Sequence, residues 1–385
     1  EPTPMQALLD AIATMPLPAD ACRIFHGRGG LYPGCEQWTL DAYPPVFVIT
    51  SFAPASDEQL AAIGAALHAR WRHIAPAGQQ HALNWVFQQR GEAQRSAGRS
   101  DTRLMAGSVP DPHIVTEAGA RYRVHVLRGQ NHGLFLDMAE GRRWVREFAA
   151  AFGAQASAAA GAAPASGAAG LQAEWACSAR QSGASSYLSD SDREARAEVG
   201  ADAPGARVLN LFAYTCAFSV AALQGGAAHV VNIDMARGAI ATGQQNHQLN
   251  GLHGGAAFLA HDIFHSWGKI TRAGPYELVI VDPPSYQKGS FVATKDYARL
   301  LRRLPDLLSD GGHALLCLNA PELSMGFLRG LVDEHAPALR FMERVPNPAV
   351  FADVDDDRAL KVAVFMKHQA DASIGLMGNQ SQAVL

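Results

Sequence analysis

Residues 208–234, "VLNLFAYTCAFSVAALQGGAAHVVNID", hold two short aliphatic runs separated by a segment of helical length. This alternation predicts a strand, a helix and a second strand, the opening unit of a nucleotide-binding α/β sheet. The first turn of such a unit normally contains several glycines, but here it reads "AYTCA", from Ala213 to Ala217. Any ligand that binds at this turn must therefore fit a turn that contains no glycine.

The missing glycines separate two classes of cofactor. NAD and FAD need glycines there because their pyrophosphate approaches the backbone at the helix N-terminus. S-adenosylmethionine has no pyrophosphate, and its methionine arm needs only a turn of small residues. The chain contains no GxGxxG sequence, which disfavours an NAD oxidoreductase. The alternative is a buried strand and helix that bind no ligand.

The C-terminal half continues the alternation of strands and helices. Helix-length stretches occupy 236–249 and 295–309, and Asp310-Gly311-Gly312 ends the second. The last two apolar runs are joined by "NPAVFADVDDDR" without a helical pattern, so we expect an antiparallel hairpin at that edge. We predict an α/β, Rossmann-like domain over 205–368 with the seven-stranded sheet of class I S-adenosylmethionine-dependent methyltransferases. The expected strands are 207–212, 229–234, 256–260, 277–282, 313–318, 339–345 and 360–366.

The second and third expected strands, 229–234 and 256–260, each bring a carboxylate to their carboxyl end. Asp234 ends the second strand, where an acid can accept both ribose hydroxyls of a nucleotide cofactor. The same residue is also a favoured helix N-cap, so a purely structural role stays open. Asp262 follows the third strand, where the amino group of adenine would lie.

The stretch "VIVDPPSYQKG" (279–289) places a third acid, Asp282, after the fourth strand. Pro283 and Pro284 stiffen the turn, so that backbone carbonyls and Asp282 can face a planar group. Tyr286 offers a stacking surface. Methyl transfer needs mainly orientation and a hydrogen-bond acceptor for the attacking atom, which this turn can supply. Taken alone, Asp-Pro-Pro is an ordinary turn between strand and loop.

These stretches together resemble the bacterial large-subunit (23S) ribosomal RNA methyltransferases. The matching sequences are "RGQNHGLFLDMAEGRRWVR", the opening stretch, "VVNIDMARGAI…NHQLNGL", "HDIF" and "ELVIVDPPSYQKG". The resemblance implies that residues 131–142 fold over the cofactor pocket, although "DMAEGR" lacks an arginine that the family usually has midway. It assigns the methyl group and target base to Asp282, Pro283, Pro284 and Tyr286. It assigns the cofactor S-adenosyl-L-methionine to Phe212, Ala213, Tyr214, Thr215, Cys216, Ala217, Asp234, Met235, Asp262, Ile263 and Asp282.

The target atom depends on whether a nucleophilic cysteine is present. Family members that methylate C5 of cytosine need one, because that carbon is not nucleophilic by itself. Asn319 occupies the corresponding position here, and Cys317 lies inside an apolar run typical of a buried cysteine. Cys216 belongs to the expected cofactor turn. An asparagine at this place is similar to the branch that methylates guanine at N7, so we expect a ring or exocyclic base nitrogen as the acceptor.

The N-terminal part has a different pattern. We expect residues 1–44 to form a segment that contacts RNA and residues 45–150 to form a smaller N-terminal α+β domain with a helix at 57–72. In "CRIFHGRGGLYPGC" (22–35), Arg23, His26 and Arg28 suit contact with RNA, and we include them with Asn319 and Tyr286 as substrate-binding candidates. A glycine-rich surface loop packed by its own aromatic residues is the alternative.

Residues 151–204 are rich in Ala, Gly and Ser, and such a composition predicts a flexible insertion. Residues 369–385 form a tail without a readable pattern. The five cysteines are scattered, with no pair or Cys/His cluster at metal spacing, so we expect a reducing compartment and no metal.

The chain has 385 residues, 48% of them hydrophobic, and a formal net charge of -4, which is typical of a globular protein. Neither a signal sequence nor a membrane span is evident, so we expect a cytoplasmic protein without membrane association. The mild acidity requires a local basic patch for any RNA partner. The sequence leaves open the oligomeric state, a protein or small-molecule substrate, and a non-catalytic cofactor-binding role.

Overall fold

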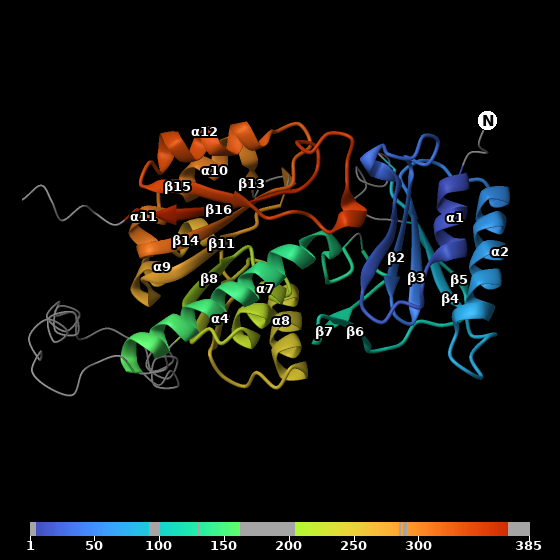
Figure 1. Cartoon of the computed structure of the whole chain (residues 1–385), viewed down its shortest axis with the longest axis horizontal. Helices are drawn as coiled ribbons and strands as arrows, with labels where there is room; N and C mark the ends of the chain where they lie inside the picture. The colour runs from blue at the N-terminus through green and yellow to red at the C-terminus, as the bar shows by residue number, and fades with distance from the viewer. Residues whose placement is uncertain are drawn as a thin grey trace, which may run out of the picture.

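The computed structural model describes residues 5–91, 101–129, 131–161, 205–284, 286–287 and 291–368. This part of the chain forms an N-terminal and a C-terminal α/β unit that lie side by side (Figure 1). No helix in the described ranges combines the length and the apolar character needed to cross a bilayer.

The C-terminal unit contains one seven-stranded sheet. Strand β16 is antiparallel to both of its neighbours, β14 and β15, and the other pairs are parallel. This order confirms the Rossmann-like sheet and the hairpin at its edge. Across the sheet the strands are β10 (Ala256–Leu259), β9 (His229–Ile233), β8 (Arg207–Leu211), β11 (Tyr276–Val281), β14 (Leu308–Leu318), β16 (Lys361–Lys367) and β15 (Leu339–Arg344).

Helices cover both faces of this sheet (Figure 1). One face carries α4 (Ala139–Gly161), α7 (Ala217–Gln224) and α8 (Arg237–Leu249). The other carries α9 (Trp267–Ala273), α10 (Ala293–Leu301), α11 (Leu304–Leu307) and α12 (Met325–His335). The helix expected at 295–309 is split into α10 and α11. Strand β14 begins before the Gly311-Gly312 pair, whereas the sequence predicted a strand after it.

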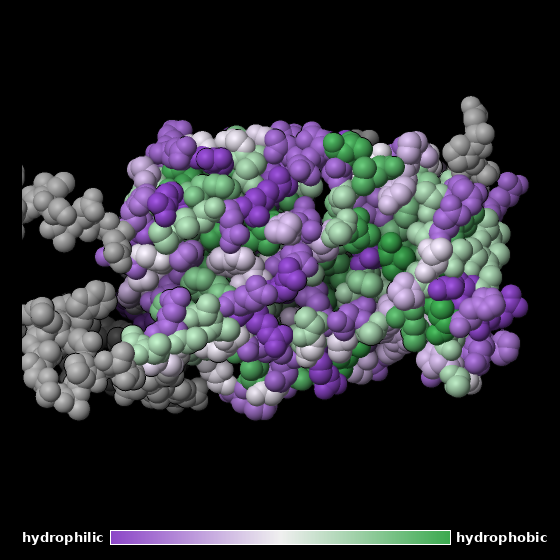
Figure 2. Space-filling model, in the orientation of Figure 1, coloured by the Kyte–Doolittle hydropathy of each residue, from purple (hydrophilic) through white to green (hydrophobic). Residues whose placement is uncertain are grey.

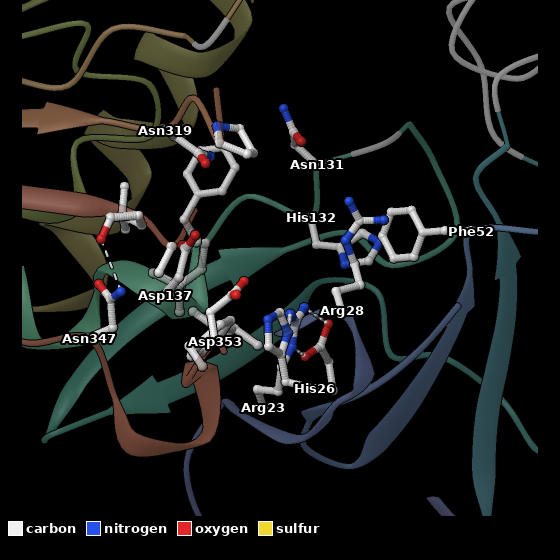
Figure 3. A pocket seen from close by; sticks show the side chains of 18 of the residues that line it. Arg23, His26, Arg28, Phe52, Asn131, His132, Asp137, Asn319, Asn347 and Asp353 are labelled. Atoms are coloured by element: carbon white, nitrogen blue, oxygen red, sulfur yellow. Dashed lines mark hydrogen bonds and ion pairs between the residues drawn. The ribbon is translucent and has the colours of Figure 1, made fainter. Parts of the chain in front are cut away.

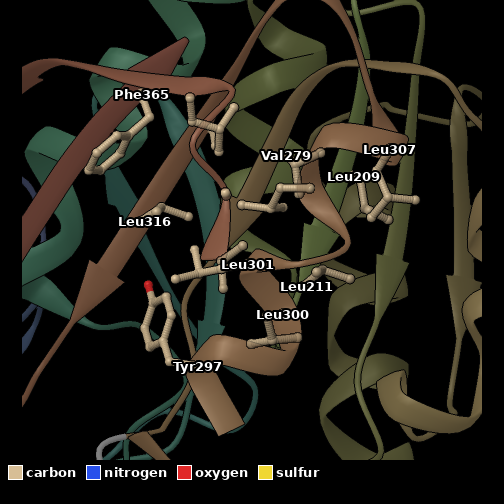
Figure 4. Packing of buried hydrophobic residues seen from close by; sticks show 14 of the residues in the cluster. Leu209, Leu211, Val279, Tyr297, Leu300, Leu301, Leu307, Leu316 and Phe365 are labelled. Carbon is tan, nitrogen blue, oxygen red and sulfur yellow. The ribbon is translucent and has the colours of Figure 1, made fainter. Parts of the chain in front are cut away.

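The sheet is buried on both sides, which explains its continuous aliphatic strands. Successive residues of a strand point to opposite faces, so Leu209 and Leu211 join the core beneath α10 and α12 (Figure 4). Val208 instead joins the core beneath α4, together with Val145 and Ala149 of that helix. Helix α4, although it precedes β8 by a long stretch of chain, is thus part of the C-terminal unit.

The N-terminal unit is a five-stranded sheet in the order of the chain, with α1 (Gln6–Thr14) and α2 (Asp57–Ile74) packed on one face. Helix α2 begins with a capping box between Ser56 and Gln59 and connects the one parallel pair, β3 and β4. The strands are β1 (Cys22–His26), β2 (Trp38–Tyr43), β3 (Val46–Ser51), β4 (Asn84–Gln89) and β5 (Asp101–Ala106).

Two expected boundaries differ from the structure. Strand β1 pairs with β2 and β2 pairs with β3, so the strands of residues 5–44 belong to the same sheet as the segment after them and do not form a separate module. Helix α4 continues to Gly161, so the predicted insertion at 151–204 starts within a helix. Residues 162–204 and the tail 369–385 lie outside the described residues.

The two units share a core. The hairpin of β6 (His113–Glu117) and β7 (Ala120–Val124) packs with Val46, Val48 and Val86 from the N-terminal sheet. The same cluster includes Val220 of α7 and Phe351 of the short helix η4 (Ala349–Phe351). In Figure 2, hydrophilic residues spread over both halves of the visible face, and hydrophobic residues gather near the junction. The junction is therefore a packed interface.

Candidate functional site

The turn between β8 and α7, residues 212–216, adopts an unusual backbone conformation. Phe212, Tyr214 and Cys216 have φ values of 57°, 48° and 59°, the left-handed region that normally favours glycine. Each such residue costs about 1–2 kcal/mol. The turn therefore makes the shape of a glycine-rich loop with other residues, and the surrounding structure must hold it in place.

Asp234, directly after β9, is one of the groups that hold the β8–α7 turn. Its carboxylate accepts hydrogen bonds from the backbone N–H of Tyr214 (2.9 Å) and of Ala236 (2.8 Å). It is not the N-cap of α8, because that position is Ala236 and has no side-chain cap. The neighbouring Met235 side chain is 54% exposed at the same edge of the sheet.

Asp262 follows β10 and has a clear local structural role. It caps the short helix η3 (Ile263–His265), accepting a hydrogen bond from the backbone N–H of Phe264 at 2.8 Å. Its second oxygen lies 2.9 Å from Nδ1 of His265. Ile263 is buried. The adenine contact expected for this pair stays a prediction.

A buried polar network lies beneath the turn. Asn210 of β8 donates to Asn232 of β9 (2.9 Å), Asn232 donates to Ser219 (3.0 Å), and the Ser219 hydroxyl lies 2.8 Å from Nε2 of His247. Next to it, Asn246 donates to the carbonyl of Thr215 at 2.9 Å. Apart from Thr215, none of these residues was predicted as part of the site, although "NHQLN" puts polar side chains on the buried side of α8.

The stretch 131–142 covers the β8–α7 turn. The Thr215 hydroxyl donates to the carbonyl of Gly133 (2.7 Å), and the Phe135 and Tyr214 rings lie 5.2 Å apart. Arg142 donates to both carboxylate oxygens of Glu117 (2.6 and 2.7 Å) and to the carbonyl of Phe135 (2.8 Å). The Thr215–Gly133 bond and the ring contact join the stretch to the turn, and the Arg142 bonds tie the stretch to Glu117.

Asp282 lies at the carboxyl end of β11, with Pro283 buried beside it. Burial raises the pKa of Asp282 to about 7, repulsion from Asp137 adds to the increase, and Arg142 opposes it. Burial also raises the pKa of Asp137. Tyr286 is part of the short strand β12 (Tyr286–Gln287), paired with β13 (Phe291–Val292), and its side chain lies outside the described part.

Neither cysteine near the site is suited to nucleophilic attack. Cys317 and Cys216 are buried, and burial raises the pKa of both thiols well above the ordinary value. The Cys317 carbonyl accepts a hydrogen bond from the Tyr297 hydroxyl at 2.9 Å. The thiols therefore stay protonated near neutral pH.

A cavity of about 340 Å³, which we call the junction cavity, lies between the two units. It brings together four predicted substrate-binding residues that are far apart in the sequence: Arg23, His26, Arg28 and Asn319. Figure 3 shows the first three entering from the N-terminal unit and Asn319 from the C-terminal unit. Asp137 also lines the cavity. Because the charge of Asp137 raises the pKa of Asp282, the cavity wall is electrostatically coupled to the carboxyl group of Asp282.

Two arginines at this wall have defined contacts. Arg23 forms a two-pronged salt bridge with Asp41 (2.7 and 3.0 Å), and its other nitrogen lies 2.8 Å from Nδ1 of His26. Burial lowers the pKa of His26 to about 4, and Arg23 adds to the effect, so the imidazole is neutral at pH 7. The Arg28 guanidinium lies over the Phe52 ring at 3.8 Å.

The glycine-rich stretch 27–30 is a contact between the two units. A Cβ atom at Gly29 would lie 2.1 Å from the carbonyl oxygen of Ala352, and the carbonyl of Gly29 accepts a hydrogen bond from Val354. Phe25 and Tyr32 do pack on each other, with ring centroids 5.0 Å apart. The stretch thus closes one side of the junction cavity.

Comparison with known proteins shows which family the chain matches. The family model described as S-adenosylmethionine-dependent methyltransferase matches residues 22–173 and 178–366. A ribosomal RNA large subunit methyltransferase K/L from Psychrobacter is 36% identical over 128 residues, 31% of this chain and 16% of that protein. A ribosomal RNA large subunit methyltransferase I from Aeromonas hydrophila is 35% identical over 132 residues, 33% of this chain and 32% of that protein. The chain thus spans less than a third of the length of these relatives.

Solved structures resemble this fold over most of the chain. A protein from Streptococcus mutans, assigned to the S-adenosylmethionine-dependent methyltransferases, has a TM-score of 0.67 and 19% identity. The match covers 94% of this chain and 81% of that one. A methyltransferase structure that contains SAH has a TM-score of 0.65 and 20% identity, and covers 94% of this chain and 78% of that one. At this identity the likeness concerns the fold alone.

Proposed function

The chain belongs to the S-adenosylmethionine-dependent methyltransferase family, and from this premise we propose that it methylates a base of ribosomal RNA. The observation that carries the proposal is the junction cavity, which aromatic and arginine side chains line together with Asp137, the acid whose charge acts on Asp282. Unstacked RNA bases are recognised by aromatic rings and guanidinium planes of this kind. The names of the relatives from Psychrobacter and Aeromonas support ribosomal RNA as the substrate.

The residues at the carboxyl edge of the sheet fit the cofactor. The β8–α7 turn presents backbone groups without a glycine-rich phosphate cradle, and each Asp234 oxygen keeps a lone pair after accepting one backbone hydrogen bond. We assign the methionine arm to the turn, the ribose to Asp234 and Met235, and the adenine to Asp262 and Ile263. When bound, the cofactor supplies an activated methyl group on a sulfonium.

We assign Asp282 to the contact with the base that accepts the methyl group. A carboxylate there can accept a hydrogen bond from the N–H of a base and orient the attacking nitrogen. Because both nearby thiols are buried and protonated, a covalent route to a base carbon lacks its nucleophile. We therefore propose a ring or exocyclic nitrogen as the methylated atom.

The test is incubation of the purified protein with methyl-labelled S-adenosylmethionine and either total RNA or ribosomal subunits from several assembly stages. Nucleoside analysis is expected to find the label in one modified base. Asp282→Ala is expected to abolish labelling, whereas Asp333→Ala, at an exposed position on α12, is the matched control. If calorimetry shows cofactor binding but RNA takes no label, the RNA assignment is wrong and a protein or small-molecule substrate becomes the leading candidate.

A further inference from the structure

Phe135 touches both parts of the site. Its ring lies 5.2 Å from that of Tyr214 in the β8–α7 turn, and it also lines the junction cavity. The residue is 40% exposed, while its neighbours Leu134 and Leu136 are buried. An aromatic ring is thus held at the border between the cavity and the turn, with part of its surface uncovered.

The backbone that carries Phe135 is fixed from several directions. Its carbonyl accepts a hydrogen bond from Arg142, whose guanidinium is also bound by both oxygens of Glu117. Two residues earlier, the carbonyl of Gly133 accepts the Thr215 hydroxyl. A stacking surface is most effective when its position is set before the ligand arrives. The surroundings of Phe135 meet this condition.

The other walls of the junction cavity indicate what kind of ligand it takes. His132 is 5% exposed and lines the cavity, and its Nε2 atom has no hydrogen-bond partner in the described chain. Asn347, on the opposite wall in Figure 3, donates to the Leu360 carbonyl, but its buried Oδ1 has no partner there. Buried polar atoms without partners cost free energy unless a ligand or water satisfies them.

These polar groups favour a base over a phosphate. The Oδ1 atom of Asn347 is a hydrogen-bond acceptor and repels phosphate oxygens, whereas an N–H or O–H of a nucleoside satisfies it. Of the four arginines that line the cavity, Arg23 is already balanced by Asp41. Neutral polar groups beside an uncovered aromatic ring match the edge and the face of an unstacked nucleobase.

We propose that Phe135 is the stacking platform for a nucleobase that enters the junction cavity, with His132 and Asn347 as the polar groups that contact the nucleoside. The inference rests on the proposed function and deepens it, because it names the residue that positions the base next to the cofactor. It makes Phe135 a determinant of RNA affinity rather than of cofactor affinity.

The test compares Phe135→Leu, Phe135→Tyr and, as a matched control, Phe341→Leu on the distant strand β15. The first readout is KM and kcat for methylation of ribosomal subunits, and the second is calorimetric Kd for S-adenosylmethionine. The third is quenching of 2-aminopurine riboside monophosphate, a base analogue whose fluorescence falls on stacking. This probe reports on the cavity even if no RNA is methylated.

Loss of one base–aromatic stack is expected to raise KM for RNA about 5- to 100-fold in Phe135→Leu. In the same variant the cofactor Kd stays within about twofold of wild type and the quenching is lost. Phe135→Tyr and Phe341→Leu behave like wild type. An unchanged KM in Phe135→Leu, or a weaker cofactor Kd with unchanged KM, overturns the inference while the proposed function stands. If wild type methylates no RNA but still quenches the probe, only the proposed reaction falls.

Discussion

Replacement of Gly243 by alanine is expected to disturb the β8–α7 turn from beneath. Gly243 lies in the middle of α8, and a Cβ atom there would be 2.4 Å from Sγ and 2.9 Å from Cβ of Cys216. Both distances are shorter than real contacts, so the turn or the helix must move. Cys216 is fully buried and can yield little space.

The net effect on stability comes from two opposing terms. Alanine gains about 1 kcal/mol over glycine in the interior of a helix. Overpacking of a dense core costs about 1–3 kcal/mol. We therefore expect Gly243→Ala to destabilise by at most about 2 kcal/mol while weakening S-adenosylmethionine about tenfold or more, since the displaced turn is the proposed cofactor contact.

A second substitution isolates the cause. Cys216→Gly removes both short contacts and suits the positive φ at that position. The double variant is expected to recover cofactor affinity, with a coupling energy of about 1–3 kcal/mol between the two sites. Gly238→Ala is the matched control, because a Cβ at this earlier position of α8 meets nothing within 4 Å.

The measurements are calorimetric titration with S-adenosylmethionine and urea unfolding of the four proteins in the cycle. The reasoning is refuted if Gly243→Ala binds the cofactor like wild type. It is equally refuted if the two substitutions are additive to within about 0.5 kcal/mol, because residues in contact must couple.

Three further predictions concern the same site. The pKa of Asp282 is about 7 in the folded protein against an ordinary 3.8, so the folded state keeps this proton to a higher pH than the unfolded chain does. The free energy of unfolding should therefore fall by up to about 4 kcal/mol between pH 4 and 8. Urea unfolding of Asp282→Asn should lack this decrease. Asn232→Leu removes the acceptor of the Asn210 amide and the donor to Ser219, and thermal unfolding should report a loss of about 2–4 kcal/mol. Arg142→Met leaves the Glu117 carboxylate without its ion-pair partner, and denaturant unfolding should show a loss of about 3–5 kcal/mol.

The sequence predicted the C-terminal sheet well because its strands are buried on both faces. Aliphatic runs such as "ELVIVD" that recur between helical patterns predict buried strands. The ends of β8, β9, β10 and β11 in the structure agree closely with the ends of these runs. Strand β14 was less regular: it begins at Leu308, ahead of Gly311, whose φ of 75° a glycine tolerates. The two glycines marked a helix end in the sequence but lie within a strand.

The N-terminal sheet was harder to predict for a physical reason. Strand β2 contains the polar residues Thr39 and Asp41, which are buried although their type suggests exposure, and β1 is short and interrupted by an irregularity between Arg23 and Phe25. Without these two strands, residues 1–44 resembled a separate segment. The pairing of β1 with β2 and of β2 with β3 depends on contacts that no local pattern reports.

The polar lining of the junction cavity could be predicted only in part. Arg23, His26 and Arg28 were identified from their composition, but Asp41, the ion-pair partner of Arg23, lies on the next strand, and this pairing reduces the charge that Arg23 offers to a ligand. His132 and Asn347 come from different units and acquire a common role only through the folded junction. Such residues carry no signal in a single sequence.

The β8–α7 turn explains why the two units must be packed together. Its left-handed residues are held by Asp234 from the adjacent strand and by Asn246 from α8. The third support, the carbonyl of Gly133, belongs to the stretch that also carries His132 and Phe135 on the cavity wall. Asn246 in turn accepts the backbone N–H of Arg123 in β7. One set of hydrogen bonds therefore fixes both the strained turn and the cavity wall, so a displacement of either is transmitted to the other.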